Sequence, residues 1–292
     1  MDDRQRQETG KAPPGGEVRD AALAMADGRR LCLRDWPLPG ARGAVLLVHG
    51  LGEHSGRYGA LAQWFLGHGY AVRGYDQRGH GRTRGQRGAL RRADDLLSDL
   101  AAVYRDYAAG LPRPPLLLGH SMGGLVALRT VLDRRIEPPA LVLSSPALRT
   151  YEPGWLQRLA RALAWAAPGL PLRNPLRLAA TSHDPRVQQA YAEDPWRSGW
   201  ITPRLADFIF RAGAACIADA AGLAVPTLLL VAGSDALVDP SGSRDFADGA
   251  AATRRLTVRF FDTLYHELFN EAEPGRGQVL RQLGDWLERR GA

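Results

Sequence analysis

The sequence predicts an α/β fold with a mostly parallel, eight-stranded sheet flanked by helices. Two patterns carry this prediction. Short apolar runs typical of buried parallel strands alternate with longer segments that have the length of helices. Glycines and polar residues follow directly after several of these runs, where open parallel sheets hold their ligands. The chain has 292 residues, 45% of them hydrophobic, which is enough to bury the core of one such domain and an insertion.

The first two predicted strands form an antiparallel hairpin, because Asp27-Gly28 between them is a turn sequence. The other strands alternate with helices, as parallel crossover units require. The predicted strands cover residues 22–26, 30–36, 44–48, 70–75, 116–118, 141–143, 227–231 and 257–261. The predicted helices cover residues 58–68, 93–109, 121–133, 241–250 and 275–289.

The most informative motif is Gly119-His120-Ser121-Met122-Gly123-Gly124, which lies between a predicted strand and a predicted helix. Glycines two positions either side of Ser121 are needed at a sharp strand-to-helix turn, because a Cβ there would collide with the neighbouring strand and helix. Such a turn exposes the serine hydroxyl as a nucleophile. The alternative is a serine that only caps the helix, and excluding it requires a base and an acid elsewhere in the chain.

Candidates for that acid and base follow later strands, in the order this architecture uses. A serine hydroxyl is a poor nucleophile at neutral pH, so an imidazole must accept its proton and a carboxylate must orient the imidazole. His266 follows the last predicted strand and is the predicted base. Asp235 is the predicted acid, and Asp239 is the competing carboxylate. Asp235 is preferred because it lies closer to the end of its strand, where the backbone direction is better fixed.

The negative oxygen of a tetrahedral intermediate needs a pair of amide donors. One is expected from Met122, the residue after the nucleophile. The other is expected from Leu51, because the strand at 44–48 ends in His-Gly-Leu-Gly. In that sequence His49 is interpreted as a residue that organises the loop rather than as a second base.

Five segments together resemble one enzyme family. They are His49–Tyr58, Asp76–Gly81, Gly119–Gly124, Ser144–Leu148 and Tyr265–Glu267. The first is the most specific, since many α/β-hydrolases share His-Gly but few continue with Gly-Glu-His-Ser-Gly-Arg-Tyr. From about Ala22 to its C-terminus, the chain resembles the monoacylglycerol lipase and lysophospholipase family of α/β-hydrolases.

The resemblance implies an α/β-hydrolase fold and hydrolysis through an acyl-enzyme. It implies that Ser121, Asp235 and His266 form the catalytic triad and that the amides of Leu51 and Met122 form the oxyanion hole. It also implies that Glu53 and Arg57 brace the oxyanion loop. The expected supporting residues are therefore His49, Gly50, Glu53, Arg57, Gly119 and Gly123. Thr83 departs from the family, which often has serine there, and residues 151–213 match it poorly, which leaves the substrate open.

The strand and helix alternation lapses within residues 150–214, which predicts a helical cap inserted over the active site. The core is then expected at 21–149 and 215–292, and residues 1–20 are expected to form a mobile tail. Residues 155–167 predict a helix with only a narrow polar wedge, too short to span a bilayer. Packing over the sheet is the preferred interpretation of this helix, and docking to a membrane surface is the alternative.

An apolar cap favours substrates with an acyl chain, since each buried methylene contributes about 0.8 kcal/mol. Monoacylglycerol is the first expected substrate, lysophospholipid the second and a general carboxylic ester the third. A thioesterase or peptidase on the same triad stays open, and a noncatalytic binding protein on this fold is disfavoured by the joint presence of the three residues. A metallohydrolase is excluded because position 270 is Asn270, so the metal-binding sequence H-E-x-x-H is absent. We expect no metal and no cofactor.

The net charge of +7 comes almost entirely from dispersed arginines, with no basic tract carrying interleaved aromatics. We therefore expect no nucleic-acid partner. Two cysteines argue against a disulfide scaffold and indicate a reducing compartment. The first residues lack an apolar core, so we expect neither a signal peptide nor an anchor. The expected location is the cytoplasm, with peripheral contact to membranes through the cap, and the sequence sets no expectation for an oligomeric state.

Overall fold

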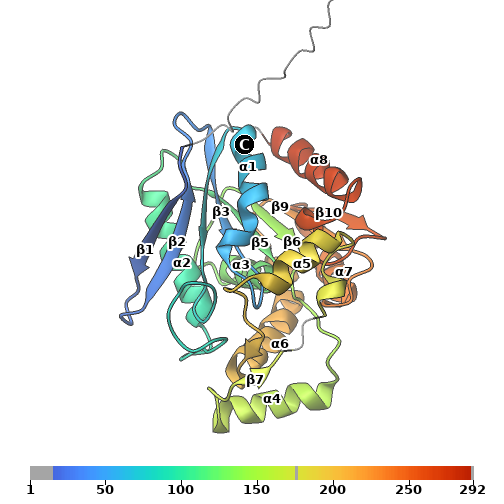
Figure 1. Cartoon of the computed structure of the whole chain (residues 1–292). Coiled ribbons are helices and arrows are strands. Elements are labelled where there is room, and N and C mark those ends of the chain that lie inside the picture. The colour runs from blue at the N-terminus through green and yellow to red at the C-terminus, as the bar shows by residue number, and fades with distance from the viewer. Residues whose placement is uncertain (1–15, 175–176, 291–292) are drawn as a thin grey trace, which may run out of the picture.

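The computed structural model describes residues 16–174 and 177–290 (Figure 1). Its centre is an eight-stranded sheet in the order β1-β2-β4-β3-β5-β6-β9-β10. β1 and β2 form the predicted antiparallel hairpin, β2 is antiparallel to β4, and the other neighbours pair in parallel. The predicted fold class is confirmed. The strands are β1 Arg19–Ala24, β2 Arg30–Trp36, β3 Gly43–Val48, β4 Tyr70–Tyr75, β5 Leu116–His120, β6 Leu141–Ser144, β9 Thr227–Ala232 and β10 Leu256–Phe261.

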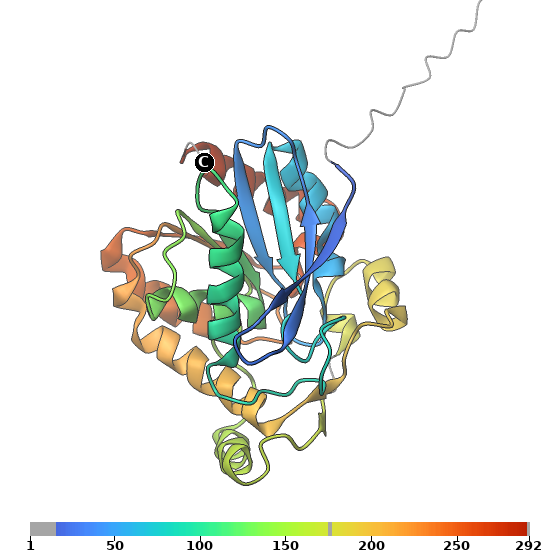
Figure 2. The same ribbon diagram turned by 90° about the vertical axis from the view of Figure 1, so that its left-hand side faces the viewer.

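Helices cover both faces of the sheet, because strand side chains alternate between the faces and the central strands are apolar on both. Leu46 and Val48 of β3 belong to the core shared with α2, α3, α6 and α7, whereas Val45 and Leu47 belong to the core shared with α1 and α8. Figure 2 shows the sheet between these layers. The helices outside the insertion are α1 Gly59–Gly67, α2 Asp95–Ala109, α3 Met122–Leu132, α7 Pro240–Ala250 and α8 Gly275–Glu288.

The segment between β6 and β9, which we call the inserted segment (residues 150–214), is mainly helical. It contains α4 Gly154–Ala166, β7 Leu172–Arg173, α5 Pro185–Glu193, β8 Trp200–Ile201 and most of α6 Pro203–Ala218. Of these elements, only α4 is expected from the sequence. Short 3-10 helices complete the described structure: η1 Ser55–Tyr58, η2 Leu178–Ala180, η3 Ala220–Gly222, η4 Ala251–Thr253 and η5 Leu268–Asn270.

The expected return to the core at residue 215 falls inside α6, which runs unbroken from Pro203 to Ala218. Packing explains why. Ala212 and Cys216 of α6 are buried in the main core, and a Cβ at Gly213 would contact the carbonyl oxygen of Leu148. The helix therefore joins the inserted segment to the core without a linker, and no Pro or Gly cluster marks a boundary there.

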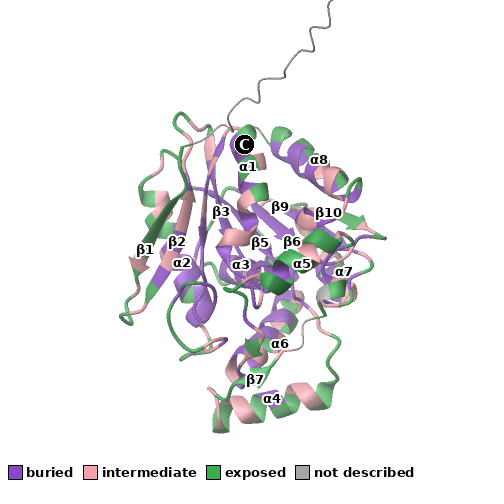
Figure 3. Ribbon diagram, viewed as in Figure 1, coloured by how far each residue is buried: buried purple, intermediate pink, exposed green. Residues whose placement is uncertain are grey.

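Helix α4 lies at the edge of the molecule and packs against α6 (Figures 1 and 3). Only Ala160 is buried among its residues, while Trp155 is 60% exposed and Trp165 is 89% exposed. The preferred prediction, that this helix packs over the sheet, is wrong. Apolar residues lie around most of α4, but α6 contacts only one side of this helix. The apolar side chains on its other sides therefore stay exposed. Within the described ranges, no helix has both the length and the apolar character needed to cross a membrane.

Candidate active site

Ser121 occupies the turn between β5 and α3 in a strained conformation, with φ 53° and ψ −123°. The flanking glycines make the turn possible. A Cβ on Gly119 would lie 2.5 Å from the carbonyl oxygen of Gly123, and a Cβ on Gly123 would collide with the carbonyls of Val48 and His49. The Ser121 amide donates to the Ser144 carbonyl at 2.9 Å, and the Ser121 carbonyl accepts from the Ala147 amide at 3.0 Å. Both backbone groups are held, so the side chain projects from a fixed corner.

Asp235 and His266 meet at the carboxyl ends of β9 and β10, where they are 2.6 Å apart from Oδ2 to Nδ1. Both side chains are almost fully buried. The amides of Leu237 and Val238 donate to the other carboxylate oxygen of Asp235 at 2.8 and 2.9 Å, which fixes the carboxylate. The competing carboxylate, Asp239, instead caps α7 by accepting from the Ser241 amide at 2.9 Å. The structure therefore brings Asp235, and not Asp239, to the imidazole.

The charges of this pair reinforce one another. Burial alone would raise the pKa of Asp235, but the facing His266 and its hydrogen bond reverse this and lower that pKa below the usual range. Burial alone would lower the pKa of His266, and the Asp235 carboxylate more than offsets it, so the imidazole pKa is raised. The arrangement favours a positively charged His266, the form that a proton-accepting base reaches during reaction.

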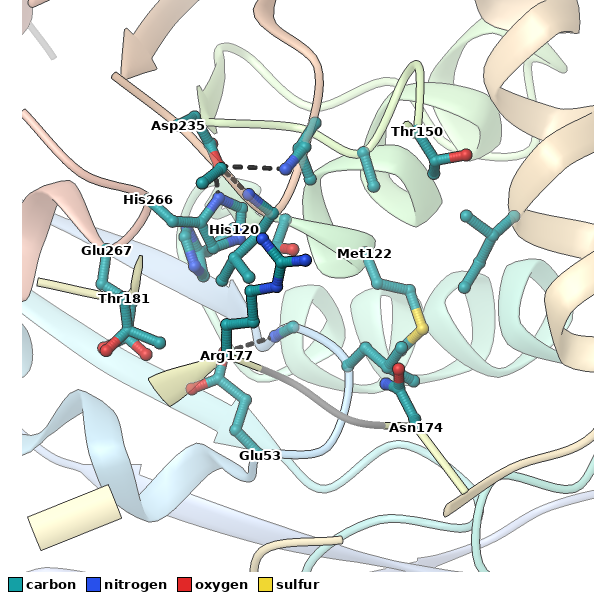
Figure 4. Close-up of a pocket in the computed structure, with 18 of the residues that line it drawn as sticks. Glu53, His120, Met122, Thr150, Asn174, Arg177, Thr181, Asp235, His266 and Glu267 are labelled. Carbon is teal, nitrogen blue, oxygen red and sulfur yellow. Dashed lines mark hydrogen bonds and ion pairs between the residues drawn. The ribbon is translucent and has the colours of Figure 1, made fainter. Parts of the chain in front are cut away.

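A pocket of about 610 Å³ is lined by Ser121, His266, Leu51 and Met122. Figure 4 shows His266 and Met122 among the side chains that line it. His266 also lies beside His120, the neighbour of Ser121, with ring centroids 4.8 Å apart. Burial and the nearby His266 lower the pKa of His120 to about 4, so this second imidazole stays neutral. Among the described residues the Ser121 hydroxyl has no hydrogen-bond partner. Serine–histidine contacts are often long before substrate binds, so the shared pocket is the relevant observation.

The loop after β3 lies directly beside the serine. A Cβ on Gly50 would be 3.1 Å from the Cβ of Ser121. Both Leu51 and Met122 line the pocket, and within the described part of the chain neither amide donates to a protein acceptor. His49 organises this loop: its Nε2 accepts from the Gln77 amide at 2.9 Å, and its Nδ1 lies 2.8 Å from the Gly50 carbonyl oxygen, to which it can donate. Burial lowers the His49 pKa, in keeping with a neutral ring.

An ion network joins the oxyanion loop to the loop of the predicted base. Glu53 accepts from the Gly50 amide at 2.5 Å and from the Tyr58 hydroxyl at 2.7 Å. Arg57 binds Glu53 at 2.7 Å and makes two further bonds of 2.8 Å to Glu267, the residue after His266. Burial opposes ionisation of Glu53, but the Arg57 charge outweighs it and the Glu53 pKa falls to about 2.

Sequence reasoning anticipated Glu53 and Arg57 in this network but missed Glu267, whose only signal is its place beside His266. It also missed Tyr191 of the inserted segment. The Tyr191 ring lies 4.3 Å from the guanidinium carbon of Arg57, and its hydroxyl donates to the Gly52 carbonyl at 3.3 Å. No periodic or motif signal in the sequence marks these partners, because each depends on a contact between distant segments.

The described residues contain no group of three or more His, Cys, Asp or Glu side chains arranged to hold a metal ion. Cys32 and Cys216 are both free cysteines. The chemistry available at this site is thus that of a buried acid–imidazole pair, a serine on a strained turn and two unpaired backbone amides in one pocket.

The chain is similar to known hydrolases over most of its length. A monoacylglycerol lipase of Mycolicibacterium smegmatis is 34% identical over 271 residues, covering 91% of this chain and 95% of that protein. The phospholipase YtpA of Bacillus subtilis is 31% identical over 233 residues, covering 78% and 89%. The crystal structure of a Paleococcus ferrophilus monoacylglycerol lipase superposes with a TM-score of 0.79 at 31% identity, covering 94% of this chain and 100% of that one.

The family model described as "Serine aminopeptidase, S33" matches residues 39–273, a range that holds every predicted site residue. This match and the relatives above confirm the resemblance drawn from the sequence. The chain belongs to the serine aminopeptidase S33 family of α/β-hydrolases.

Proposed function

We propose that this protein is a carboxylic ester hydrolase that releases fatty acid from a monoacyl ester through an acyl-enzyme on Ser121. The observation that carries the proposal is the 2.6 Å pair of Asp235 and His266, which lines the same pocket as a serine on a strained turn. A serine that only capped α3 would need no such pair beside it, and its side chain makes no capping hydrogen bond.

In the proposed reaction, Ser121 Oγ attacks the ester carbon while His266 accepts the hydroxyl proton. The ester oxygen becomes negative and receives hydrogen bonds from the Leu51 and Met122 amides, each contributing on the order of 3 kcal/mol to lowering the barrier. His266 then returns the proton to the leaving alcohol. Water attacks the acyl-enzyme with His266 again as base, which releases the fatty acid and restores Ser121. Throughout, the Asp235 carboxylate stabilises the imidazolium.

Monoacylglycerol is the first proposed substrate and lysophospholipid the second. Met122, Ile209 and Phe210 give the pocket an apolar wall for an acyl chain. Thr150 and Asn174 also line it, and their buried Oγ1 and Nδ2 atoms have no hydrogen-bond partner in the described structure. The hydroxyls of a glycerol headgroup could pair with both. The names of the lipase and phospholipase relatives support the same two substrates.

Other acyl substrates are alternatives on the same triad. The family description names aminopeptidases, and a peptidase of that kind needs a carboxylate free to bind the α-ammonium group of its substrate. In this pocket Glu53 and Glu267 are both bound by Arg57, which disfavours them in that role, but the exposed Glu152 also lines the pocket and has no ion-pair partner in the described structure, so peptide substrates stay in the test panel. General carboxylic esters and thioesters demand only the acyl site and remain in the test panel.

The inserted segment is proposed to be a lid. It is joined to the oxyanion loop at Gly52, whose carbonyl accepts from the Ser198 amide at 2.8 Å as well as from Tyr191. We further propose that the outer face of α4 touches membrane, which supplies monoacyl lipids. Trp155, Leu159 and Trp165 of that helix are exposed. Most of α4 carries the colours of exposed and intermediate residues in Figure 3.

The test is turnover by Ser121→Ala. We expect hydrolysis of p-nitrophenyl esters to fall by about four orders of magnitude or more. Ser98→Ala, at an exposed position on α2, is the matched control and should hydrolyse normally. A panel of monoacylglycerols and lysophosphatidylcholines of increasing chain length then ranks the substrates by fatty acid release. Unchanged turnover by Ser121→Ala would rule out the proposed function.

A further inference from the structure

A second cavity, remote from the catalytic pocket, is lined by arginines. It has a volume of about 650 Å³ and lies between the β1–β2 turn and the loop after β4. We call it the basic cavity. Ten residues line it, and its charged members are Arg29, Arg30, Arg82, Arg84, Arg91 and Asp27. Five cations and one carboxylate line the cavity, so its lining carries a net positive charge that favours an anionic ligand.

The carboxylates nearby are already committed to other partners. Asp27 accepts from the Arg78 guanidinium at 3.1 Å, and Arg91 stays 3.9 Å from it. Asp20 pairs with both Arg34 and Arg82, at 2.9 and 2.6 Å. Among the described residues, the side chains of Arg30 and Arg84 have no ion-pair or hydrogen-bond partner. The protein therefore neutralises only part of the positive charge of the cavity, and Arg30 and Arg84 are left without a counter-ion in the described structure.

Arg29 is held in place at the wall of this cavity. Its Nη1 donates to the Arg84 carbonyl at 2.9 Å, while its Nε is buried and has no hydrogen-bond partner. Gly85 permits this approach, because it adopts φ 132° and a Cβ there would collide with the Arg29 guanidinium. Arg29 is therefore a cation held at the wall of the cavity by the backbone of the loop after β4.

The position of the cavity indicates what it binds. The β1–β2 turn and the loop after β4 lie at the end of the molecule that carries α4, in both ribbon views (Figures 1 and 2). Gln86 of that loop donates to the Gly169 carbonyl, three residues beyond α4, at 2.5 Å. Trp196, itself partly exposed, lies 5.5 Å from the Arg82 guanidinium carbon. Exposed tryptophans beside arginines are typical of surfaces that rest on anionic membranes.

From the charge, the volume and this position, we infer that the basic cavity binds the phosphate headgroup of an anionic phospholipid and so directs the protein to negatively charged membranes. Guanidinium groups pair with phosphate oxygens through two parallel hydrogen bonds, and several arginines can share one phosphate. The inference adds a headgroup site to the proposed contact of α4 with membrane. It does not depend on the catalytic roles proposed for Ser121 and His266.

The test compares co-flotation with vesicles of phosphatidylcholine alone and of phosphatidylcholine mixed with phosphatidylglycerol. We expect the wild-type protein to prefer the anionic vesicles and to lose this preference as salt is raised. The double variant Arg30→Gln, Arg84→Gln should bind the anionic vesicles roughly thirty-fold more weakly, given what each arginine near such a surface contributes. Its turnover of a soluble p-nitrophenyl ester should match the wild type, which shows that it folds and separates this result from any failure of the proposed function.

The matched control is the double variant Arg113→Gln, Arg255→Gln. These two arginines are exposed, lack ion-pair partners among the described residues and precede β5 and β10, at the opposite end of the sheet. Equal weakening by the two double variants would reduce the effect to net charge and overturn the inference. Equal binding of wild type to both kinds of vesicle would overturn it as well, as would stabilisation by inorganic pyrophosphate without any preference for anionic vesicles.

Discussion

The catalytic pocket and helix α4 differ in how their residues are held. In the pocket, Arg57 and its two carboxylate partners are each more than nine-tenths buried, and every one of them makes hydrogen bonds of 2.8 Å or less. On α4 a single alanine is buried and two tryptophans face solvent. Buried charges tolerate no loss of a partner, whereas exposed apolar side chains tolerate many changes. The contrast agrees with the two proposals made above, in which the pocket carries the chemistry and α4 contacts the membrane.

The largest effect on activity is expected from replacing the predicted acid of the pocket, Asp235. Asp235→Asn should lower kcat for a soluble ester by about 10,000-fold, because the imidazole loses both its orientation and its stabilising charge. Asp239→Asn is the matched control. The amide oxygen of Asn can still cap α7, so this variant should change stability by less than about 0.5 kcal/mol and leave kcat within about threefold. A larger loss of kcat for Asp239→Asn than for Asp235→Asn would reverse the assignment of the acid.

A smaller effect is expected from breaking the ion network that joins the oxyanion loop to the loop of His266. Arg57→Gln leaves two buried carboxylates facing each other without a cation, so we expect a loss of about 3 kcal/mol in the free energy of unfolding. Displaced loops should lower kcat about 10- to 100-fold. Chemical denaturation and ester kinetics measure the two. The comparison variant is Arg211→Gln, which breaks a longer pair of 3.5 Å whose guanidinium is 61% exposed and should shift stability by no more than about 1 kcal/mol. Equal losses of stability and of kcat in the two variants would argue against a role of the ion network in holding the two loops.

The pH dependence of activity tests the charge of His266 in the same pocket without disrupting the fold. His266 must be neutral to accept a proton, and Asp235 raises its pKa above 6.5. Activity is therefore lost as pH falls through this raised pKa, and kcat/KM should decline on the acid side with an apparent pKa above 6.5. In Asp235→Asn the residual activity should decline at lower pH, since the carboxylate that raises the pKa is gone. An acid limb that does not move in this variant would mean that another group titrates.

The sequence also predicts the catalytic pocket better than it predicts α4 and the rest of the inserted segment. The strands and the strand-to-helix turn at Ser121 were predicted because each depends on local features: apolar runs of strand length, an Asp-Gly turn and glycines flanking Ser121. The pairing of Asp235 with His266 was predicted because acid and base follow later strands in the order that this architecture uses, and because Asp235 lies closer than Asp239 to the end of its strand. Glu267 and Tyr191 were missed, since their partner Arg57 lies on a different loop and no local pattern announces such a contact.

The inserted segment was predicted least well. The sequence shows that the alternation of strands and helices lapses in this segment. Its end could not be located because α6 continues into the core without a break, and α5 is too polar to be told from a loop. The exposure of α4 was the opposite of the preferred expectation, because a sequence shows which residues are apolar and not whether a partner surface reaches them. The basic cavity was invisible for the same reason: its arginines look dispersed along the chain and converge only through the β1–β2 turn.

The smallest effect on chemistry is expected at α4. Trp155→Ser combined with Trp165→Ser should leave kcat/KM for a soluble ester unchanged and alter stability by no more than about 0.5 kcal/mol, since both side chains face solvent. Binding to vesicles should weaken by about tenfold or more, because two indole rings no longer enter the interface. Co-flotation and soluble-ester kinetics on the same preparation separate the two effects. Unchanged vesicle binding would remove α4 from the membrane contact.

The central claim is that one serine, activated by His266, carries the acyl group. Intact mass after treatment with a fluorophosphonate, followed by peptide mapping, measures this most directly. The account predicts a single adduct per chain, located on Ser121, whose rate of formation falls on the acid side together with ester hydrolysis. An adduct on another residue, or full ester turnover by the fully labelled protein, would contradict it.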